Sequence, residues 1–475
     1  MTQPSHYFKR HFPTFLLTVA LLLLAQAPGA FSAELPPAVT RALQEAGIPL
    51  RSVAVVVQRV DTDRPLIRHN ALQAMNPASA MKLVTTYAAL ELLGPAYTWK
   101  TEALADSLAI KGQLSGNLYL RGSGDPRLAL EQFWLLLRQL RVRGVTNIGG
   151  DLILDRSAFA LPIHNPAEFD NEPLRPYNAG PDALLVNLKS LRLTLTPDAA
   201  QNAVGVVAET PSEDLRIENR LALTRDACGD WRERIKVKVT DESIELMGSL
   251  SASCGDKALN LSPWPADVQV DRLFRALWRE LGGSLSGKTR DGLTPAATRI
   301  LAIQESPPLS EVVREINKYS NNVMARQLFL ALAAKRPATA EGARQRIEEW
   351  LDDKKLKLPA LVIDNGSGLS RSDRVSADGL SQLLLAAWSS PVMPELMSSL
   401  PLAGIDGTLK KRLGNSAAAG RAHLKTGYLE GVRAIAGYVL DSNDQRWVVV
   451  FLINDPKSRM GKPAMDALLR WVAER

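Results

Sequence analysis

The sequence predicts an α/β fold of the α+β kind, in which an antiparallel sheet is flanked by helices and interrupted by a β-rich insertion. Three observations predict it. An apolar strand at residues 52–57 lies near the N-terminus. Two strand-like runs near the C-terminus, 433–440 and 447–453, are separated by a polar turn and form a hairpin. Helical patterning between them is broken by residues 98–262, where short strand-like runs alternate with Gly and Asp turns. Strands from both ends of the chain can therefore share one sheet.

Helices are expected wherever apolar residues recur three or four positions apart. Gly47 ends the first helix, Gly94 ends the second, and Ser376 is the expected N-cap of the seventh. The last helix is expected to pack on the hairpin. A membrane-surface position is the alternative, which is disfavoured because the polar face carries few Lys or Arg residues. The expected helices span residues 37–46, 79–93, 270–281, 309–318, 322–334, 345–351, 376–388 and 463–475.

The β-rich stretch, residues 98–262, is interpreted as one or two inserted domains. Residues 34–97 and 263–475 would then form one discontinuous domain. Both cysteines of the chain, Cys228 and Cys254, fall in the insertion and suit one disulfide formed in an oxidising compartment. The strand-like runs of the insertion include 116–120, 151–154, 193–196, 205–208 and 235–239.

Residues 1–33 have the organisation of a secretory signal peptide. Lys9 and Arg10 give the positive start, residues 15–25 the apolar core, and residues 30–33 the small-residue cleavage region. The apolar run is short for a bilayer span, and no later stretch qualifies. We expect an exported chain with no transmembrane anchor after signal cleavage; an uncleaved anchor is the alternative.

Charge and composition exclude several classes of partner. The formal net charge is +7, and removal of the signal with its two basic residues lowers it to +5. This mild charge suits contact with an anionic cell wall or membrane surface, but no Lys/Arg stripe with aromatic residues indicates a nucleic acid partner. The five histidines are scattered, so neither a zinc cluster nor a histidine-based triad is indicated. No metal or cofactor is expected.

Ser79 and Lys82 form the first candidate pair of catalytic residues. The predicted helix places both in its first turn and on one face, near the positive end of the helix dipole. A serine needs a neighbouring base to become a nucleophile, and a Ser–Lys pair supplies one. The alternative is a helix-start serine beside a surface lysine, because a chain of this size and average composition contains about one Ser-x-x-Lys by chance.

Two further motifs fit this pair. Ser320-Asn321-Asn322 falls between two expected helices, where a short loop can direct side chains into a cleft. Helix caps are the alternative interpretation of the same residues. Lys425-Thr426-Gly427 precedes the C-terminal hairpin, and a glycine there allows another group to approach the strand backbone closely. An ordinary turn is the alternative.

The ordered set Ser-x-x-Lys, Ser-x-Asn and Lys-Thr-Gly matches the signature of penicillin-recognising serine enzymes. The long insertion between the first two motifs is unlike the short helical domain of compact β-lactamases. Over essentially the whole mature chain, the sequence resembles the D-alanyl-D-alanine carboxypeptidase/endopeptidase family of the penicillin-binding protein 4 type. The phrases that carry this resemblance are Gly124-Asp125-Pro126, Asp151-Leu152-Ile153-Leu154-Asp155, Pro181-Asp182-Ala183-Leu184, 364–371 and 403–409.

The resemblance implies a transpeptidase/β-lactamase-like domain that acts on peptidoglycan peptides and is covalently inhibited by β-lactams. It implies a periplasmic protein, in loose contact at most with membrane or cell wall, and leaves the oligomeric state open. Ser79 would be the nucleophile, and Lys82 would accept its proton once the nearby cation Lys425 favours the neutral amine. Ser320 would relay a proton to the leaving amine, and Asn322 would hold Lys82 and the substrate amide.

The resemblance also implies a set of substrate-binding residues. Lys425 and Thr426 would bind the terminal carboxylate of the substrate. Backbone N–H groups of Ser79 and of Tyr428, which follows Gly427, would bind the oxyanion. Family members often have a small residue in place of this tyrosine, which affects only the expected pocket shape.

Arg371 and Asp155 resemble the pocket residues that hold the free amino-acid end of the third residue of the stem peptide. In the alternative interpretation, Asp155 caps a turn and Arg371 is a surface loop residue. For the whole chain, the rival functions are a β-lactamase, which would need a dedicated deacylating base, and a non-catalytic peptidoglycan-binding protein with a relic site.

Overall fold

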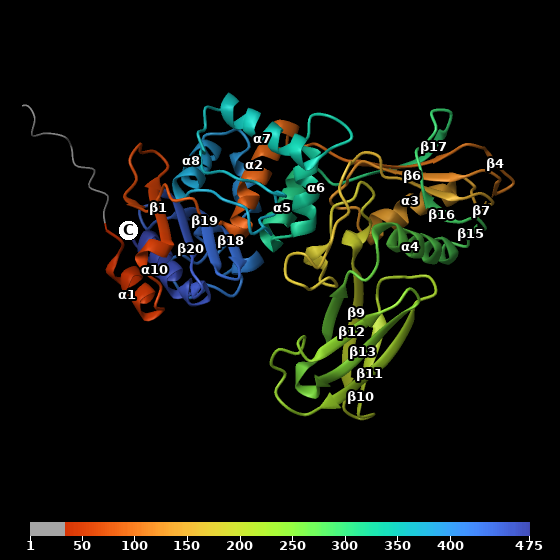
Figure 1. Ribbon diagram of the computed structural model, residues 1–475, viewed down its shortest axis with the longest axis horizontal. Helices are drawn as coiled ribbons and strands as arrows, with labels where there is room; N and C mark the ends of the chain where they lie inside the picture. The colour runs from red at the N-terminus through yellow and green to blue at the C-terminus, as the bar shows by residue number, and fades with distance from the viewer. Residues whose placement is uncertain (1–33) are drawn as a thin grey trace, which may run out of the picture.

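The computed structural model describes residues 34–475, so the predicted signal peptide lies outside the described residues. One end of the molecule holds a central sheet and its helices, and a long insertion extends from it (Figure 1). The central sheet has five antiparallel strands in the order β18-β19-β20-β1-β2. Its strands are β1 (Val53–Arg59), β2 (Ile67–His69), β18 (Ala422–Leu429), β19 (Val432–Leu440) and β20 (Arg446–Asn454).

This sheet confirms the predicted fold class, because the N-terminal strand pairs with the C-terminal hairpin. Val53 of β1 lies opposite Ile453 of β20. Alternate residues of each strand face opposite layers of helices, so both faces of the sheet are buried. The helices of this part are α1 (Pro37–Glu45), α2 (Lys82–Leu93), α5 (Leu309–Tyr319), α6 (Asn322–Ala331), α7 (Ala340–Asp353), α8 (Ala377–Trp388), α9 (Met393–Ser399) and α10 (Lys462–Ala473).

Helix α10 and the N-cap of α8 also agree with the predictions. The apolar side of α10, including Met465, Leu468 and Val472, is buried with α1 against the sheet. The alternative of a membrane-surface helix therefore does not apply to α10. Ser376 caps α8, since its hydroxyl accepts the Gly379 N–H at 2.9 Å. Within residues 34–475, no helix has the length and apolar character needed to cross a membrane.

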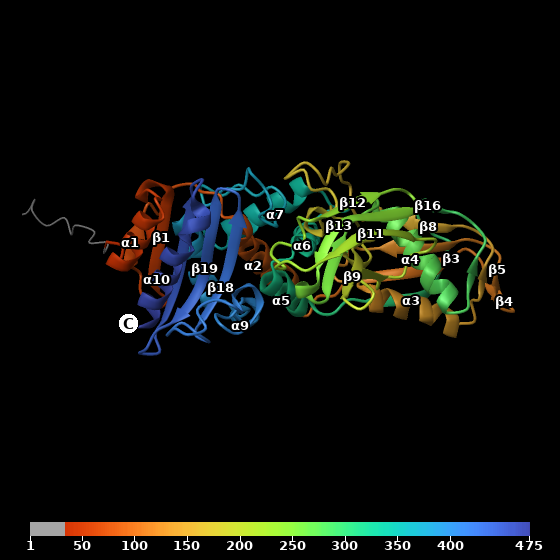
Figure 2. The same cartoon turned by 90° about the horizontal axis from the view of Figure 1, so that it is seen from below.

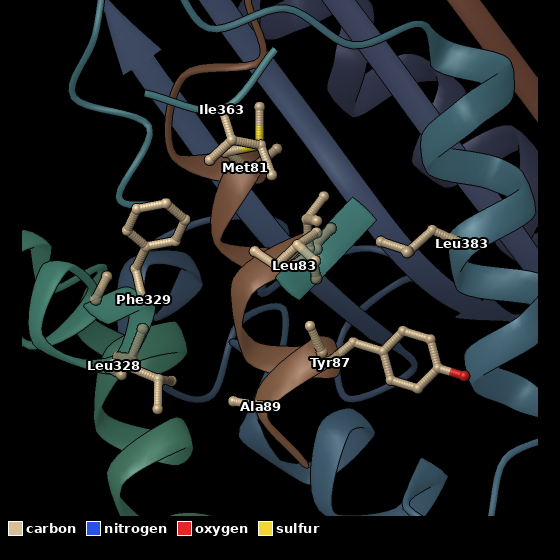
Figure 3. Packing of buried hydrophobic residues seen from close by; sticks show 14 of the residues in the cluster. Met81, Leu83, Tyr87, Ala89, Leu328, Phe329, Ile363 and Leu383 are labelled. Atoms are coloured by element: carbon tan, nitrogen blue, oxygen red, sulfur yellow. The ribbon is translucent and has the colours of Figure 1, made fainter. Parts of the chain in front are cut away.

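Helix α2 is the centre of the larger helical layer. Its residues from Lys82 to Leu90 are all buried, as expected of a helix that other elements surround. Figure 3 shows Leu328 and Phe329 of α6 on one side of it, and Leu383 of α8 on the other. The turn that precedes α2 is therefore anchored by a helix in close contact with the rest of this layer.

The insertion has two parts with separate hydrophobic cores. In the first part, helices α3 and α4 pack on a five-stranded sheet of order β16-β8-β6-β3-β17, beside a smaller sheet of order β15-β7-β5-β4. The two views show this part at the end of the molecule away from the central sheet (Figures 1 and 2). Its elements are β3 (Lys100–Ala105), β4 (Ala109–Ile110), β5 (Gln113–Leu114), β6 (Leu118–Gly122), α3 (Leu130–Val142), β7 (Asn147–Ile148), β8 (Leu152–Asp155), α4 (Ala266–Glu280), β15 (Ser284–Leu285), β16 (Thr289–Asp291) and β17 (Arg299–Glu305).

The second part consists of two three-stranded sheets of order β10-β9-β14 and β11-β13-β12. Apolar residues from both sheets share one core. This part projects to one side of the molecule in Figure 1. Its strands are β9 (Leu191–Asp198), β10 (Ala203–Ala208), β11 (Arg216–Thr224), β12 (Ile235–Val239), β13 (Ser243–Ser251) and β14 (Lys257–Leu261).

The expected end of the insertion at residue 262 lies too early in the chain. Helix α4 shares the core of α3, and strands β15, β16 and β17 pair with β7, β8 and β3 of the insertion. β15 and β16 have only two and three residues, which is too short for a period-two pattern to mark them. Helix α3 was not expected either, although Phe133, Leu136, Leu137 and Leu140 on one face of it are buried.

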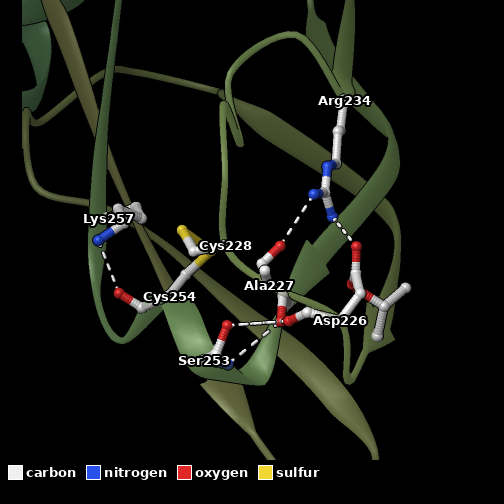
Figure 4. Close-up of a disulfide and its surroundings, with 9 residues drawn as sticks. Asp226, Ala227, Cys228, Arg234, Ser253, Cys254 and Lys257 are labelled. Atoms are coloured by element: carbon white, nitrogen blue, oxygen red, sulfur yellow. Dashed lines mark hydrogen bonds and ion pairs between the residues drawn. A yellow bond between two sulfur atoms is a disulfide. The ribbon is translucent and has the colours of Figure 1, made fainter.

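The predicted disulfide joins Cys228 to Cys254, whose Cα atoms are 4.8 Å apart. It links the loop after β11 to a short 3₁₀ turn after β13, as Figure 4 shows. Ser253 beside it donates a hydrogen bond to the Asp226 carbonyl oxygen at 2.9 Å. The disulfide therefore stabilises the second part of the insertion, which lies away from the central sheet (Figure 1).

Replacement of both cysteines by serine is expected to destabilise the second part of the insertion by about 2–4 kcal/mol, because the bridge closes a loop with a sequence separation of 26. Thermal unfolding followed by limited proteolysis, with fragments mapped to residues 191–261, measures this effect. Reduced wild-type protein is the control and should behave like the variant. Unchanged unfolding and proteolysis of the variant would contradict the prediction.

Candidate active site

Ser79 lies in a 3₁₀ turn, η2 (Ala78–Met81), that runs directly into α2. Ala78 before it has a positive φ of 46°, which is strained for a residue other than glycine. The Asn76 side chain holds this turn, since its Oδ1 accepts the Ala78 N–H at 2.8 Å and its amide donates to the Ser370 carbonyl oxygen at 2.8 Å. Asn454 at the end of β20 accepts the Asn76 N–H at 2.8 Å. Hydrogen bonds of Asn76 to Ser370 and to the end of β20 therefore hold the strained turn in place.

The Lys82 amine is completely buried and has three oxygen neighbours. Its Nζ lies 3.1 Å from the Ser79 Oγ and donates to the Asn322 Oδ1 at 2.7 Å and to the Ser367 carbonyl oxygen. A neutral amine has two N–H donors and one lone pair. With Asn322 and Ser367 accepting its two protons, its lone pair is left for the Ser79 hydroxyl proton. The geometry thus suits a base next to a nucleophile.

Electrostatics favour this neutral form. Burial lowers the pKa of Lys82 well below the ordinary value, and the positive charges of Lys425 and then Arg326 lower it further, against an opposite effect of Asp373. Burial also lowers the pKa of Lys425 to about 7. We expected the charge of Lys425 to favour the neutral form of Lys82, and its effect on the Lys82 pKa has this direction.

Ser320 and Asn322 lie on either side of the junction between α5 and α6. Ser320 ends α5 in the left-handed conformation with φ of 57°, and Asn321 caps α6 by accepting the Met324 N–H at 3.1 Å. The cap interpretation therefore applies to Asn321. Asn322 contacts Lys82, as described above, and Ser320 Oγ accepts a hydrogen bond from Lys425 Nζ at 2.8 Å. The three motifs meet in one site.

Glycines allow the backbone segments of the site to approach each other. A Cβ on Gly427 of β18 would lie 2.6 Å from the Pro77 carbonyl oxygen and 3.1 Å from the Ala78 Cβ. A Cβ on Gly368, whose φ is +77°, would overlap the Ala78 carbonyl oxygen. The edge strand β18 and the loop before Leu369 therefore both pack on the Ser79 turn.

Arg371 and Tyr428 lie farther out than these residues. The Arg371 guanidinium lies over the Phe169 ring at 4.7 Å and donates to the Glu430 carbonyl oxygen at 3.1 Å. Both Arg371 and Phe169 line a cavity of about 490 Å³. Tyr428 is 54% exposed, and its ring contacts the Arg433 guanidinium at 5.1 Å. Arg371 therefore faces a cavity, as expected of a pocket residue, whereas the Tyr428 side chain points outward.

Asp155 is not among the residues that line that cavity, and its expected role as a ligand for a substrate ammonium stays a prediction. Its carboxylate is buried and accepts hydrogen bonds from Ser157 N–H, from the Ser157 hydroxyl at 2.6 Å, and from Thr294 N–H at 2.8 Å. The residue ends β8 and joins it to the segment after β16. These hydrogen bonds are those of a turn cap, which is the alternative interpretation of Asp155.

Several residues of the site were not predicted. Lys82 contacts the backbone carbonyl of Ser367, which no side-chain motif can reveal. The only sequence signal is the pair of flanking glycines, Gly366 and Gly368, which allow other groups to approach the backbone closely. Arg326 lies one turn after Asn322 on α6, and burial lowers its pKa to about 10. Burial raises the pKa of Asp373 to about 7. Neither residue belongs to a recognisable motif. In residues 34–475, no group of His, Cys, Asp and Glu side chains is arranged to hold a metal ion.

Comparisons with known proteins agree with this geometry. The sequence model of the "D-Ala-D-Ala carboxypeptidase 3 (S13) family" matches residues 35–475. A D-alanyl-D-alanine carboxypeptidase of Actinomadura sp. (strain R39) is 31% identical over 434 residues, which cover 88% of this chain and 80% of the relative.

Solved structures share the fold. The structure of penicillin binding protein 4 (DacB) from Haemophilus influenzae is 24% identical, with a TM-score of 0.74 over 91% of this chain and 99% of that one. A predatory endopeptidase, Bd0816 of Bdellovibrio bacteriovorus, is 15% identical, with a TM-score of 0.53 over 89% of this chain and 95% of its own. Since the family model spans nearly every described residue, the chain belongs to the D-Ala-D-Ala carboxypeptidase 3 (S13) family.

Proposed function

We propose that this protein is a serine D-alanyl-D-alanine carboxypeptidase that cleaves peptidoglycan stem peptides through an acyl-enzyme on Ser79. The observation that carries the proposal is the buried Lys82 amine 3.1 Å from the Ser79 Oγ, with its other contacts to Asn322 and Ser367. Family membership supports the same reaction. The non-catalytic alternative does not account for a strained serine turn beside a lysine whose pKa is lowered.

In the proposed acylation step, Ser79 Oγ attacks the carbonyl carbon of the penultimate D-Ala, and its proton passes to Lys82 Nζ. Collapse of the tetrahedral intermediate breaks the peptide C–N bond, and the leaving amine receives a proton through Ser320, which Lys425 holds at 2.8 Å. Water then hydrolyses the ester and frees Ser79. The N–H groups of Ser79 and Tyr428 are proposed to bind the oxyanion.

The terminal carboxylate of the substrate is proposed to bind at Lys425 and Thr426, at the edge of β18. A carboxylate stands beside the scissile bond both in D-Ala-D-Ala stems and in D-Ala-diaminopimelate cross-links. One site can therefore perform carboxypeptidase and endopeptidase reactions, and a protein of similar fold is named an endopeptidase. Arg371, on the wall of the cavity of about 490 Å³, is proposed to bind the carboxylate at the amino-acid end of the third stem residue.

β-Lactams are proposed to acylate Ser79 in the same way. The Haemophilus influenzae relative has been solved in a complex with a β-lactam, with a TM-score of 0.71 to this chain. We propose that the activity takes place in the periplasm, at the cell wall; the predicted signal peptide at residues 1–33 and the proposed peptidoglycan substrate support this location.

A fluorescent β-lactam is expected to label the wild-type protein covalently and to leave Ser79→Ala unlabelled, because Ser79 is the proposed nucleophile and its Oγ lies 3.1 Å from the buried Lys82 amine. Gel fluorescence after denaturation measures the labelling, and mass spectrometry of the labelled peptide locates it. Ser157→Ala, a change in the insertion, is the matched control and should label normally. Equal labelling of Ser79→Ala and the wild type would exclude the proposed nucleophile.

A long-lived adduct separates this function from that of a β-lactamase. We expect the labelled fraction to persist after free β-lactam is removed, while release of D-Ala from a D-Ala-D-Ala peptide stays blocked for the same time. Recovery within seconds, together with hydrolysis of many β-lactam molecules per protein, would instead identify a β-lactamase.

The pH dependence of kcat/KM is expected to be bell-shaped. Activity should fall at acid pH as Lys82 becomes protonated and can no longer accept the Ser79 proton. It should fall again above about pH 7, because the lowered pKa of Lys425 removes the cation that binds the carboxylate. Lys425→Arg keeps its charge to higher pH, so its alkaline limb should move up while the acid limb stays. The measurement is D-Ala release between pH 5 and 10; an unmoved alkaline limb would contradict the assignment to Lys425.

A further inference from the structure

The segment from Pro401 to Leu409 lies along the first half of β18. Its Pro401 carbonyl oxygen accepts the Leu424 N–H at 2.9 Å, and the Ala403 N–H donates to the Ala422 carbonyl oxygen at 3.0 Å. After this short pairing the segment turns through a 3₁₀ turn, η6 (Gly407–Leu409). It therefore follows the strand that carries the Lys-Thr-Gly motif up to the point where that motif begins.

This turn brings Thr408 to Thr426. The two Oγ1 atoms are 2.8 Å apart, and Thr408 is exposed while Thr426 is half-buried. Each hydroxyl has one proton, so only one of the two can donate to the other. The hydroxyl proton of the other threonine can therefore point toward a bound group. If an acceptor binds between the two hydroxyls, both protons can point toward it.

Lys318 fixes the position of this turn. Its buried Nζ donates to the two Asp406 carboxylate oxygens at 2.9 and 2.6 Å, and to the Leu400 carbonyl oxygen at 2.6 Å. A Cβ on Gly407, whose φ is +56°, would lie 2.6 Å from the Lys318 carbonyl oxygen. The turn is thus held against the end of α5, two residues before Ser320.

We propose that Thr408 is a further carboxylate-binding residue, which donates a hydrogen bond to the terminal carboxylate of the substrate beside the one from Thr426. A carboxylate has two oxygens and accepts only, so two adjacent hydroxyls match it. Lys425, whose Nζ also donates to the Thr426 carbonyl oxygen at 2.9 Å, supplies the positive charge. This inference rests on the proposed function of the site and specifies how it selects substrates with a free carboxyl end.

The test compares two thioester probes that differ only at the carboxylate. One is an N-acyl-D-alanyl thioester of thioglycolate, and the other is the corresponding thioglycolamide. Thr408→Val is expected to lower kcat/KM for the carboxylate probe about ten- to a hundredfold, as loss of a hydrogen bond to a charged group implies, and to change the amide probe by less than about twofold. Thr408→Ser keeps the hydroxyl and should stay within about threefold of wild type on both probes.

Thr298→Val in the insertion is the matched control and should change neither probe, since its hydroxyl contacts only the Pro295 carbonyl oxygen. An equal loss on both probes in Thr408→Val would show a structural effect and overturn the inference, and so would an unchanged rate on the carboxylate probe. If Ser79→Ala still cleaved the amide probe, the proposed function itself would fail. That outcome is separate, because it does not depend on Thr408.

Discussion

The proposed active site depends on the burial of one amine, that of Lys82. Burying an amine is costly unless it loses its charge or gains an ionic partner. Here its contacts are oxygens of Ser79, Asn322 and Ser367, and the charge that lowers its pKa most is that of the second buried amine, Lys425. The surrounding helices exclude water and so favour the neutral form. The apolar surroundings of α2 therefore serve the chemistry as well as the stability of the helical layer.

Backbone segments that approach closely then position the reacting groups. Gly427 and Gly368 let β18 and a loop pack on the strained turn at Ala78. Gly407 does the same for the turn that carries Thr408. Each of these three glycines lies close to a main-chain carbonyl oxygen of the neighbouring segment. A side chain at any of these three glycines would move one wall of the site away from Ser79, the proposed nucleophile.

Helices and strands with a clear periodic pattern of apolar residues were predicted well. Strands that form only through pairing with distant strands were not. The hairpin of β19 and β20, the strand β1 and helix α10 have strong apolar patterns, and the structure contains all of them. The spacing of apolar residues in α4 predicted a helix, but it did not predict that this helix packs on α3. The pairing of β16 and β17 with strands about 140 and 200 residues earlier could not be predicted either, because β16 has only three residues and the seven residues of β17 include a single buried one, Ala302.

The order of residues shows which groups are available for the proposed reaction: Ser79 and Lys82 at a helix start, followed by the two later motifs. How these residues meet, and which others join them, follows from the folded structure alone. It brought the Ser367 carbonyl to Lys82, turned the Asp155 carboxylate inward, and placed Thr408 beside Thr426. These contacts depend on backbone atoms and on long-range packing, and neither leaves a recognisable pattern in the order of side chains.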